Sequence, residues 1–191
     1  MLEYIVEIIA KLLVIWVPSK RVKREIRDKI KTFFYGFKII TNAKEIGKGF
    51  VCEGWSYCGK NTVIKDNVRI NGIKADGFGK LTIGKYCQFG KDIRIITQNH
   101  DYDNSPTLPY GKGDILKDVE IGDFCWIGTG AMLLPGTKIG EGAIIQAGAV
   151  VHGEIPRGGI AGGNPAVVFK YRNMEHFEEL KSKGAFLNYY E

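Results

Sequence analysis

The feature that most constrains the fold of this 191-residue chain is a repeat of six residues. From Ile121 the sequence reads IGDFCW, IGTGAM, LLPGTK, IGEGAI, IQAGAV and VHGEIP, and every unit opens with an aliphatic residue. The same frame fits three units from Ile83 and four units from Ile46. A period of six matches neither the 3.6-residue period of an amphipathic helix nor the simple alternation of an isolated strand. Internal repetition of this kind predicts a solenoid.

The repeat also predicts which side chains point inward. The first position of each unit should face the core, and the fifth should be small because side chains crowd at the corners between short strands. Stacked coils would then bury an apolar column and pair their backbones in parallel. The four cysteines, Cys52, Cys58, Cys87 and Cys125, all fall on these two positions. We therefore expect buried, reduced thiols that pack as small hydrophobic groups, and no zinc or redox site.

Two segments interrupt the repeat. The Gly-rich segment Asn71–Lys80 is expected to be a modest loop or an irregular coil. A compact solenoid does not need the longer segment His100–Glu120, and long loops on rigid scaffolds commonly carry function. His100 begins this second segment, and the only other histidines are His152 and His176. His100 is therefore the candidate functional residue, whereas His152 is expected to be an ordinary outward-facing side chain.

Positive charge is concentrated near the amino terminus. Residues 1–44 hold ten Lys and Arg against four Asp and Glu, so they carry the whole formal excess of +6. The apolar run Ile5–Val17 is too short to span a bilayer, and Ser19 could cap a basic helix that follows it. One interpretation is a helical hairpin packed on the body. The other is that residues 1–40 contact an anionic membrane surface. Signatures of nucleic-acid binding are missing, so no nucleic-acid partner is expected.

These patterns divide the chain into three parts. Residues 1–44 form a basic helical segment, residues 45–170 form the solenoid with an inserted loop at 98–120, and residues 171–191 form a helical tail. No cleavable signal peptide is recognisable, and reduced thiols suit the cytoplasm. We therefore expect a cytoplasmic protein, peripheral at the inner face of the membrane if the basic segment lies on lipid.

Three motifs add a resemblance to this reading of the residues. The loop that begins NHDYDNSP, the WIG after it and the terminal AGGNPA resemble left-handed β-helix acyltransferases, in the branch of maltose, galactoside and polysaccharide O-acetyltransferases. The resemblance covers about residues 46–172. It implies an all-β core folded as a left-handed parallel β-helix, with N-terminal helices and a short C-terminal helix. It also implies a homotrimer that binds acetyl-CoA, its acyl donor, in clefts between subunits.

The resemblance implies a role for the loop histidine. His100 matches the catalytic histidine of the family and would accept the proton of a sugar hydroxyl as that oxygen attacks the thioester. Imidazole titrates near neutral pH, and such a base typically contributes ~10²–10⁴-fold. Its orienting partner is left open among a backbone carbonyl, Asp101 and Asp103. Asn99 and Asp101 are the expected substrate contacts, although Asn99 could instead fill a corner position.

Further residues match the donor site of the family. Trp126 is expected to wall the cleft and contact donor and acceptor, with a place in the trimer interface as the alternative. The other residues matched to the CoA channel and its phosphates are Gly128, Thr129, Ala147, Gly148, Lys170 and Arg172. The last two could equally be solvated bases. A zinc enzyme of the carbonic-anhydrase kind would need three converging histidines, and His176 lies outside the repeat, so no metal is expected.

The function implied is acetyl transfer from acetyl-CoA to a sugar hydroxyl, in the biosynthesis of a surface polysaccharide or its precursor. Two alternatives stay open at this point. One is an N-acetyltransferase that acts on an amino sugar or a xenobiotic amine, and the other is a trimeric scaffold without catalytic activity.

Overall fold

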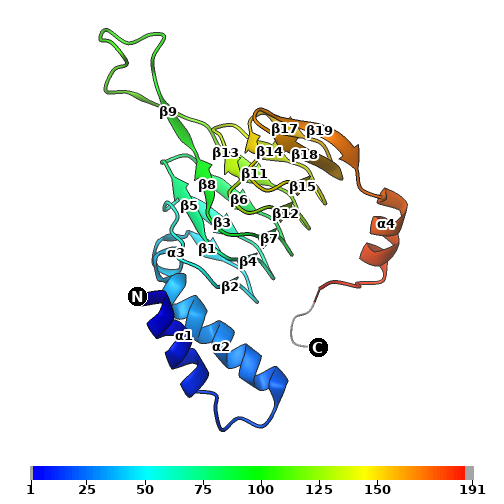
Figure 1. Cartoon of the computed structure of the whole chain (residues 1–191). Coiled ribbons are helices and arrows are strands. Elements are labelled where there is room, and N and C mark those ends of the chain that lie inside the picture. Colours follow the sequence, from blue (N-terminus) through cyan, green and yellow to red (C-terminus); the bar gives the residue numbers. More distant parts are fainter. Residues whose placement is uncertain (1, 188–191) are drawn as a thin grey trace.

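The computed structural model describes residues 2–187, whose main element is a parallel β-solenoid of about six turns. Three sheets form its faces, and the chain passes from one sheet to the next within each turn (Figure 1). The first sheet contains β1 (Glu45–Ile46), β3 (Thr62–Ile64), β6 (Leu81–Ile83), β11 (Val119–Ile121), β14 (Lys138–Ile139) and β17 (Glu154–Ile155). The second sheet contains β2 (Val51–Cys52), β4 (Arg69–Ile70), β7 (Gln88–Phe89), β12 (Trp126–Ile127), β15 (Ile144–Ile145), β18 (Gly159–Gly163) and the antiparallel β19 (Ala166–Tyr171). The third sheet contains β5 (Ile73–Asp76), β8 (Ile93–Ile96), β13 (Met132–Leu133) and β16 (Val150–Val151). The predicted parallel β-helix is confirmed.

The first and fifth positions of the repeat have the predicted burial. Ile127 and Ile145 open their units, lie opposite each other in register and are at most 1% exposed. Thr137 occupies a fifth position and is fully buried. Its hydroxyl oxygen lies 2.8 Å from the carbonyl oxygen of Leu134 and 3.0 Å from that of Val151, so the polar atom is satisfied inside the corner.

The four cysteines are buried and unpaired by disulfides, as the repeat predicts. Burial raises the pKa of Cys52 to about 11, and burial also raises the pKa of Cys58. The Sγ atoms of Cys87 and Cys125 lie 3.1 Å and 3.2 Å from corner carbonyl oxygens of the neighbouring coil. These thiols pack as small hydrophobic groups with weak hydrogen bonds.

The segment Asn71–Lys80 was expected to be a modest loop or an irregular coil of the solenoid. It is part of a coil, because it contains a strand. Its central residues form β5, which pairs in parallel with β8 from Ile73 opposite Ile93 to Asp76 opposite Ile96. Ile73 and Ala75 point into the core, so the alternation of a strand is present despite the flanking glycines. The segment therefore closes the third face of the second turn.

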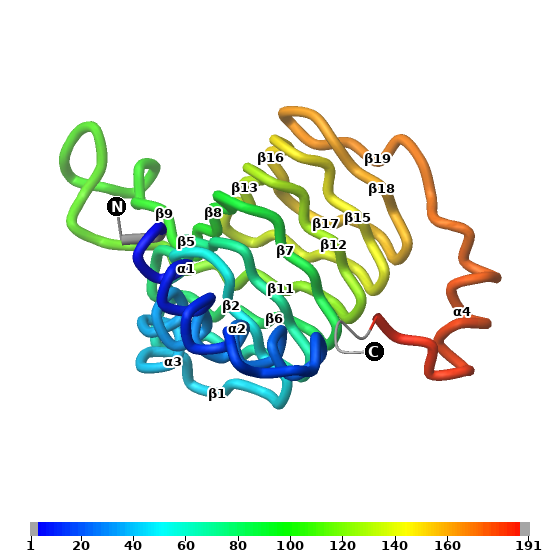
Figure 2. Tube along the Cα trace, turned by 60° about the horizontal axis from the view of Figure 1, so that its bottom comes forward, coloured from blue at the N-terminus to red at the C-terminus, as the bar shows by residue number. Residues whose placement is uncertain are grey.

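Two helices cap the β1–β2 end of the solenoid (Figures 1 and 2). They are α1 (Leu2–Leu12) and α2 (Lys20–Tyr35), and the short α3 (Phe37–Asn42) leads into β1. The predicted cap is present, because the hydroxyl of Ser19 accepts a hydrogen bond from the backbone N–H of Val22. Within residues 2–187, no helix has the length and apolar character needed to cross a membrane.

The predicted carboxy-terminal helix is α4 (Met174–Ser182), capped by the side chain of Asn173. It is tied to the solenoid through Glu141, whose carboxylate pairs with Lys181 of the helix and with Arg157 of the last turn. Helix α4 and the loop after β8 project from opposite sides of the solenoid (Figures 1 and 2).

Candidate active site

The long insertion begins and ends as an antiparallel pair of strands, β9 (Gln98–His100) and β10 (Asp114–Leu116). In this pair His100 lies directly opposite Asp114. Because opposite residues of an antiparallel pair project to the same side, their side chains meet: Nδ1 of His100 is 3.2 Å from Oδ1 of Asp114. The hairpin carries this pair away from the solenoid (Figure 1).

A second contact fixes the plane of the imidazole. The ring of Tyr110 stacks on that of His100, with 3.9 Å between the centroids and 6° between the planes. The imidazole is still 47% exposed. With the phenol on one face and a carboxylate at Nδ1, the edge that carries Nε2 is left for a ligand.

The orienting partner of His100 is therefore Asp114, which was not among the candidates from the sequence. Asp101 instead holds the loop together, since its Oδ1 accepts a hydrogen bond of 2.9 Å from the backbone N–H of Asn104. The side chain of Asn99 accepts a hydrogen bond of 2.9 Å from the backbone N–H of His100. Asn99 thus lies beside the imidazole but on a strand, opposite Ile115, and not at a corner of the solenoid.

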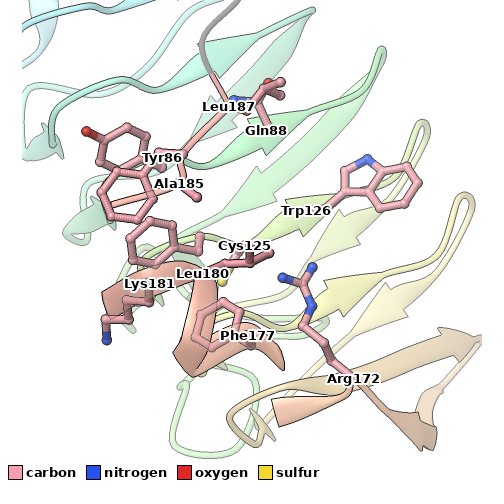
Figure 3. Close-up of a pocket in the computed structure, with 12 residues that line it drawn as sticks. Tyr86, Gln88, Cys125, Trp126, Arg172, Phe177, Leu180, Lys181, Ala185 and Leu187 are labelled. Atoms are coloured by element: carbon pink, nitrogen blue, oxygen red, sulfur yellow. The ribbon is translucent and has the colours of Figure 1, made fainter. Parts of the chain in front are cut away.

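Trp126 lies on the outer surface of the second sheet and is 55% exposed, as its place in the repeat predicts. It borders a pocket of about 490 Å³ between this sheet and α4 (Figure 3). Aromatic side chains dominate the pocket, including Phe124, Phe177 and Phe186. Trp126 also borders a smaller and more polar hollow of about 270 Å³, to which Arg24 of α2 contributes.

The four small residues matched to the donor channel come together at one corner, directly after β12 and β15. The backbone N–H of Gly148 donates to the carbonyl oxygen of Thr129 at 2.8 Å, and Gly128 donates to Ile145 at 2.8 Å. A Cβ atom on Gly128 would lie 2.5 Å from the backbone nitrogen of Ala147, so this position requires glycine.

The two bases at the end of the core have different environments. The guanidinium of Arg172 lies 5.4 Å from the centroid of the Phe177 ring and lines the aromatic pocket (Figure 3). Burial lowers the pKa of Arg172. Lys170 lies on β19 opposite Ile160 and is exposed. Only Arg172 therefore shares a pocket with Trp126.

One chain does not bring all the predicted site residues together. His100 follows the third-sheet strand β8, whereas Trp126 lies on the second sheet and the small-residue corner follows it. Figures 1 and 2 place the β9–β10 loop on the side of the solenoid away from α4, which closes the pocket beside Trp126. In the described part of the chain, no group of three or more His, Cys, Asp or Glu side chains could hold a metal ion.

Comparison with known proteins matches residues 118–153 to the family described as bacterial transferase hexapeptide (six repeats). The protein YvoF of Bacillus subtilis, named as an acetyltransferase, is 46% identical over 105 residues, which cover 55% of each chain. The galactoside O-acetyltransferase of Lactococcus lactis is 33% identical over 98 residues, or 51% of this chain and 46% of the relative. This chain thus spans about half the length of either relative.

A solved structure of a galactoside acetyltransferase in complex with coenzyme A is similar over nearly the whole fold. It has a TM-score of 0.63 and covers 92% of this chain and 84% of its own. At 22% sequence identity, this similarity concerns the fold.

Proposed function

We propose that this chain, whose residues 118–153 match the hexapeptide family of bacterial transferases, is an acetyl-CoA-dependent O-acetyltransferase acting on a sugar hydroxyl. The acceptor we propose is a surface polysaccharide or its precursor. The observation that carries the proposal is the imidazole of His100, held by Asp114 at one nitrogen and open at the other.

His100 acts as the general base in this proposal. With Oδ1 of Asp114 at 3.2 Å from Nδ1, the proton of the neutral imidazole is placed on Nδ1, and the lone pair of Nε2 accepts the proton of the acceptor hydroxyl. The donor supplies an activated thioester carbonyl, and the acceptor oxygen forms the new C–O bond as its proton passes to His100. When the C–S bond breaks, the protonated imidazole returns that proton to the departing sulfur. The resting state of His100 is thereby restored.

The donor-binding residues suit an extended thiol ester with a phosphorylated end. The corner of Gly128, Thr129, Ala147 and Gly148 presents backbone groups with few side-chain atoms above them, which fits a narrow pantetheine arm. Arg172 lies partly buried among aromatic rings, where a guanidinium favours an anionic partner such as a phosphate. We assign Lys170, which is exposed and lies outside this pocket, a weaker electrostatic role toward the same phosphates.

A homotrimer is the assembly we propose, because the two halves of the site lie apart in one chain. The β9–β10 loop would extend His100 and Asn99 toward the second sheet of a neighbouring subunit, where Trp126 walls the cleft. A reducing, cytoplasmic location fits the four free thiols. We also propose that residues 1–40 contact the inner face of a membrane.

The test is acetyl transfer by the purified protein, followed by release of free thiol from acetyl-CoA. A panel of neutral sugars and amino sugars separates the proposed reaction from N-acetylation, because hydroxylamine cleaves an O-acetyl ester and leaves an amide intact. The His100→Ala variant should lose ~10²–10⁴-fold in turnover while it binds acetyl-CoA as the wild type does. Turnover that survives in this variant would refute the role of His100. Transfer only to amines would replace the proposed acceptor class, and no transfer to any acceptor would favour a scaffold.

A further inference from the structure

Helix α1 has a buried apolar face and also an exposed one. The side that packs on α2 presents Val6, Ala10 and Val14, which are at most 4% exposed. The opposite side is exposed, and together with the turn that follows it forms what we call the outer α1 face: Ile5, Ile8, Leu12, Leu13, Ile15 and Trp16. Contiguous exposed apolar side chains of this kind, beside a face that is already buried, mark an interaction surface.

This helix is instead the outermost layer of its end of the molecule. Helix α2 contacts β2, and α1 contacts α2 from beyond it (Figures 1 and 2). Trp16, at the tip of the hairpin, is 91% exposed. The outer α1 face is therefore an apolar surface that the fold leaves uncovered in one chain.

Polar contacts hold the hairpin in place. Lys31 of α2 pairs with Glu7 of α1 at 2.6 Å. Helix α2 is in turn fixed to the solenoid, because its Asp28 pairs with Arg69 of β4 at 3.1 Å. The outer α1 face is thus presented in a defined orientation by packed elements.

Basic side chains follow the apolar tip at the start of α2. Lys20 and Arg21 are exposed at the start of α2, and the Nζ atom of Lys23 reaches to 3.5 Å from the carbonyl oxygen of Ile15. These three bases belong to the first turn of α2, which rises about 1.5 Å per residue, so they lie next to the tip. The neutral balance of residues 45–191 and the excess of +6 in residues 1–44 place the basic charge at this end of the chain.

The acidic groups near the bases are already paired. Glu25 binds Lys29 at 2.8 Å, and Glu7 and Asp28 have the partners described above. They therefore do little to neutralise the charge around the tip. An apolar face bordered by bases, with an indole between them, is complementary to a bilayer whose surface is anionic.

We infer that the outer α1 face binds the surface of an anionic lipid bilayer. Helix α1 lies in the plane of the interface, Trp16 and Leu13 enter the level of the headgroups, and Lys20, Arg21 and Lys23 contact lipid phosphates. The hairpin lies on the membrane and does not cross it. This inference rests on the membrane contact proposed above for residues 1–40 and names the surface that makes it, and it does not depend on the identity of the acyl acceptor.

The first test uses sedimentation of the full chain with vesicles of phosphatidylcholine alone or mixed with phosphatidylglycerol. We expect binding to the mixed vesicles, weakened by high salt. Because each base near the surface contributes a factor of about five, the Lys20→Gln/Arg21→Gln/Lys23→Gln variant should bind about 10²-fold more weakly. A matched control removes the same charge from the body, with Lys48→Gln/Lys60→Gln/Lys91→Gln, and should bind like the wild type. Equal loss in both variants, or equal binding to both vesicle types, would overturn the inference.

The second test follows Trp16 itself. In a Trp55→Phe/Trp126→Phe background Trp16 is the single indole, and lipids brominated on the acyl chain should quench its fluorescence on binding. Unquenched fluorescence in the vesicle-bound protein would contradict insertion of the tip. The Leu13→Ser/Trp16→Ser variant should lose vesicle binding with unchanged mass by light scattering. A smaller mass for this variant would show that the face joins copies of the chain, and would overturn the membrane proposal.

Discussion

Asp114 lies directly opposite His100 in the antiparallel pair of β9 and β10, and its Oδ1 is 3.2 Å from Nδ1 of the imidazole. The pairing is a consequence of strand register, so the backbone of the hairpin sets the rotation of the ring. Tyr110 adds a stacking contact on the face of the same ring. The imidazole is thus oriented before any ligand arrives, which reduces the entropy lost in the reactive geometry.

The first prediction concerns Asp114 as a positioning residue. Asp114→Asn should lower kcat by roughly 10²-fold, because an amide can hold the wrong tautomer and no longer stabilises the protonated ring. KM for acetyl-CoA should stay within a factor of two, since the residues proposed to bind CoA lie elsewhere. Steady-state kinetics with the acceptor found in the screen measures both values.

Two further variants separate orientation from general damage to the loop. Asp103→Asn changes an exposed carboxylate of the same loop and should leave kcat unchanged. Asp114→Glu keeps the charge and should recover part of the loss. If Asp103→Asn and Asp114→Asn were equally slow, the positioning role of Asp114 would be wrong.

Most of the fold follows from the sequence because the repeat has one physical requirement in every unit. Ile127 and Ile145 are separated by three six-residue units, which make one full coil. They therefore lie in adjacent coils on the same face and pair in register. The segment Asn71–Lys80 was predicted less well. Its glycines suggested a break, while the decisive feature was the inward alternation of Ile73 and Ala75, which is too short to distinguish from chance in a sequence.

The candidate site could be predicted only where the chain itself places a residue. His100 was found because it stands at the point where the repeat stops. Asp114 was missed because its place opposite His100 depends on the register of a hairpin whose long tip has no repeat to count from. The aromatic pocket beside Trp126 was missed as well, since Phe177 and Phe186 reach it through the docking of α4, a long-range contact without a sequence signal.

The second prediction tests whether the site is shared between subunits. His100→Ala and Trp126→Ala should each be impaired alone, the latter by about tenfold from loss of an aromatic wall. Coexpression of the two variants should recover activity, because in a mixed trimer one cleft can combine the intact His100 of one chain with the intact Trp126 of its neighbour. If both residues served a cleft within one chain, no mixed assembly would contain an intact site, and activity would not recover.

The third prediction concerns the four buried thiols. Burial raises the pKa of Cys52 to about 11, so at pH 8 only about one in a thousand Cys52 side chains is a thiolate. All four cysteines are also shielded from solvent. The folded protein should therefore react very slowly with a disulfide reagent, and four thiols should be titrated once guanidinium unfolds it. Rapid labelling of the folded protein would show that the coils open, and would also give a background in thiol-release assays.

The fourth prediction concerns the carboxylate that ties α4 to the solenoid. Burial alone would raise the pKa of Glu141, but hydrogen bonds from Lys181 and Arg157 outweigh it, and the net effect lowers this pKa. A lowered pKa in the folded state gives stability that is present above the unfolded value of about 4.3 and is lost as the pH falls through the folded value. Glu141→Gln should therefore reduce the free energy of unfolding at pH 7 by about 1 kcal/mol, and by less near pH 3, where the wild type has lost the same contribution. Thermal unfolding at both pH values measures this difference, with Glu120→Gln, an exposed carboxylate of the first sheet, as the control. A loss of equal size at both pH values would mean that the packing of the side chain, and not its charge, holds α4 in place.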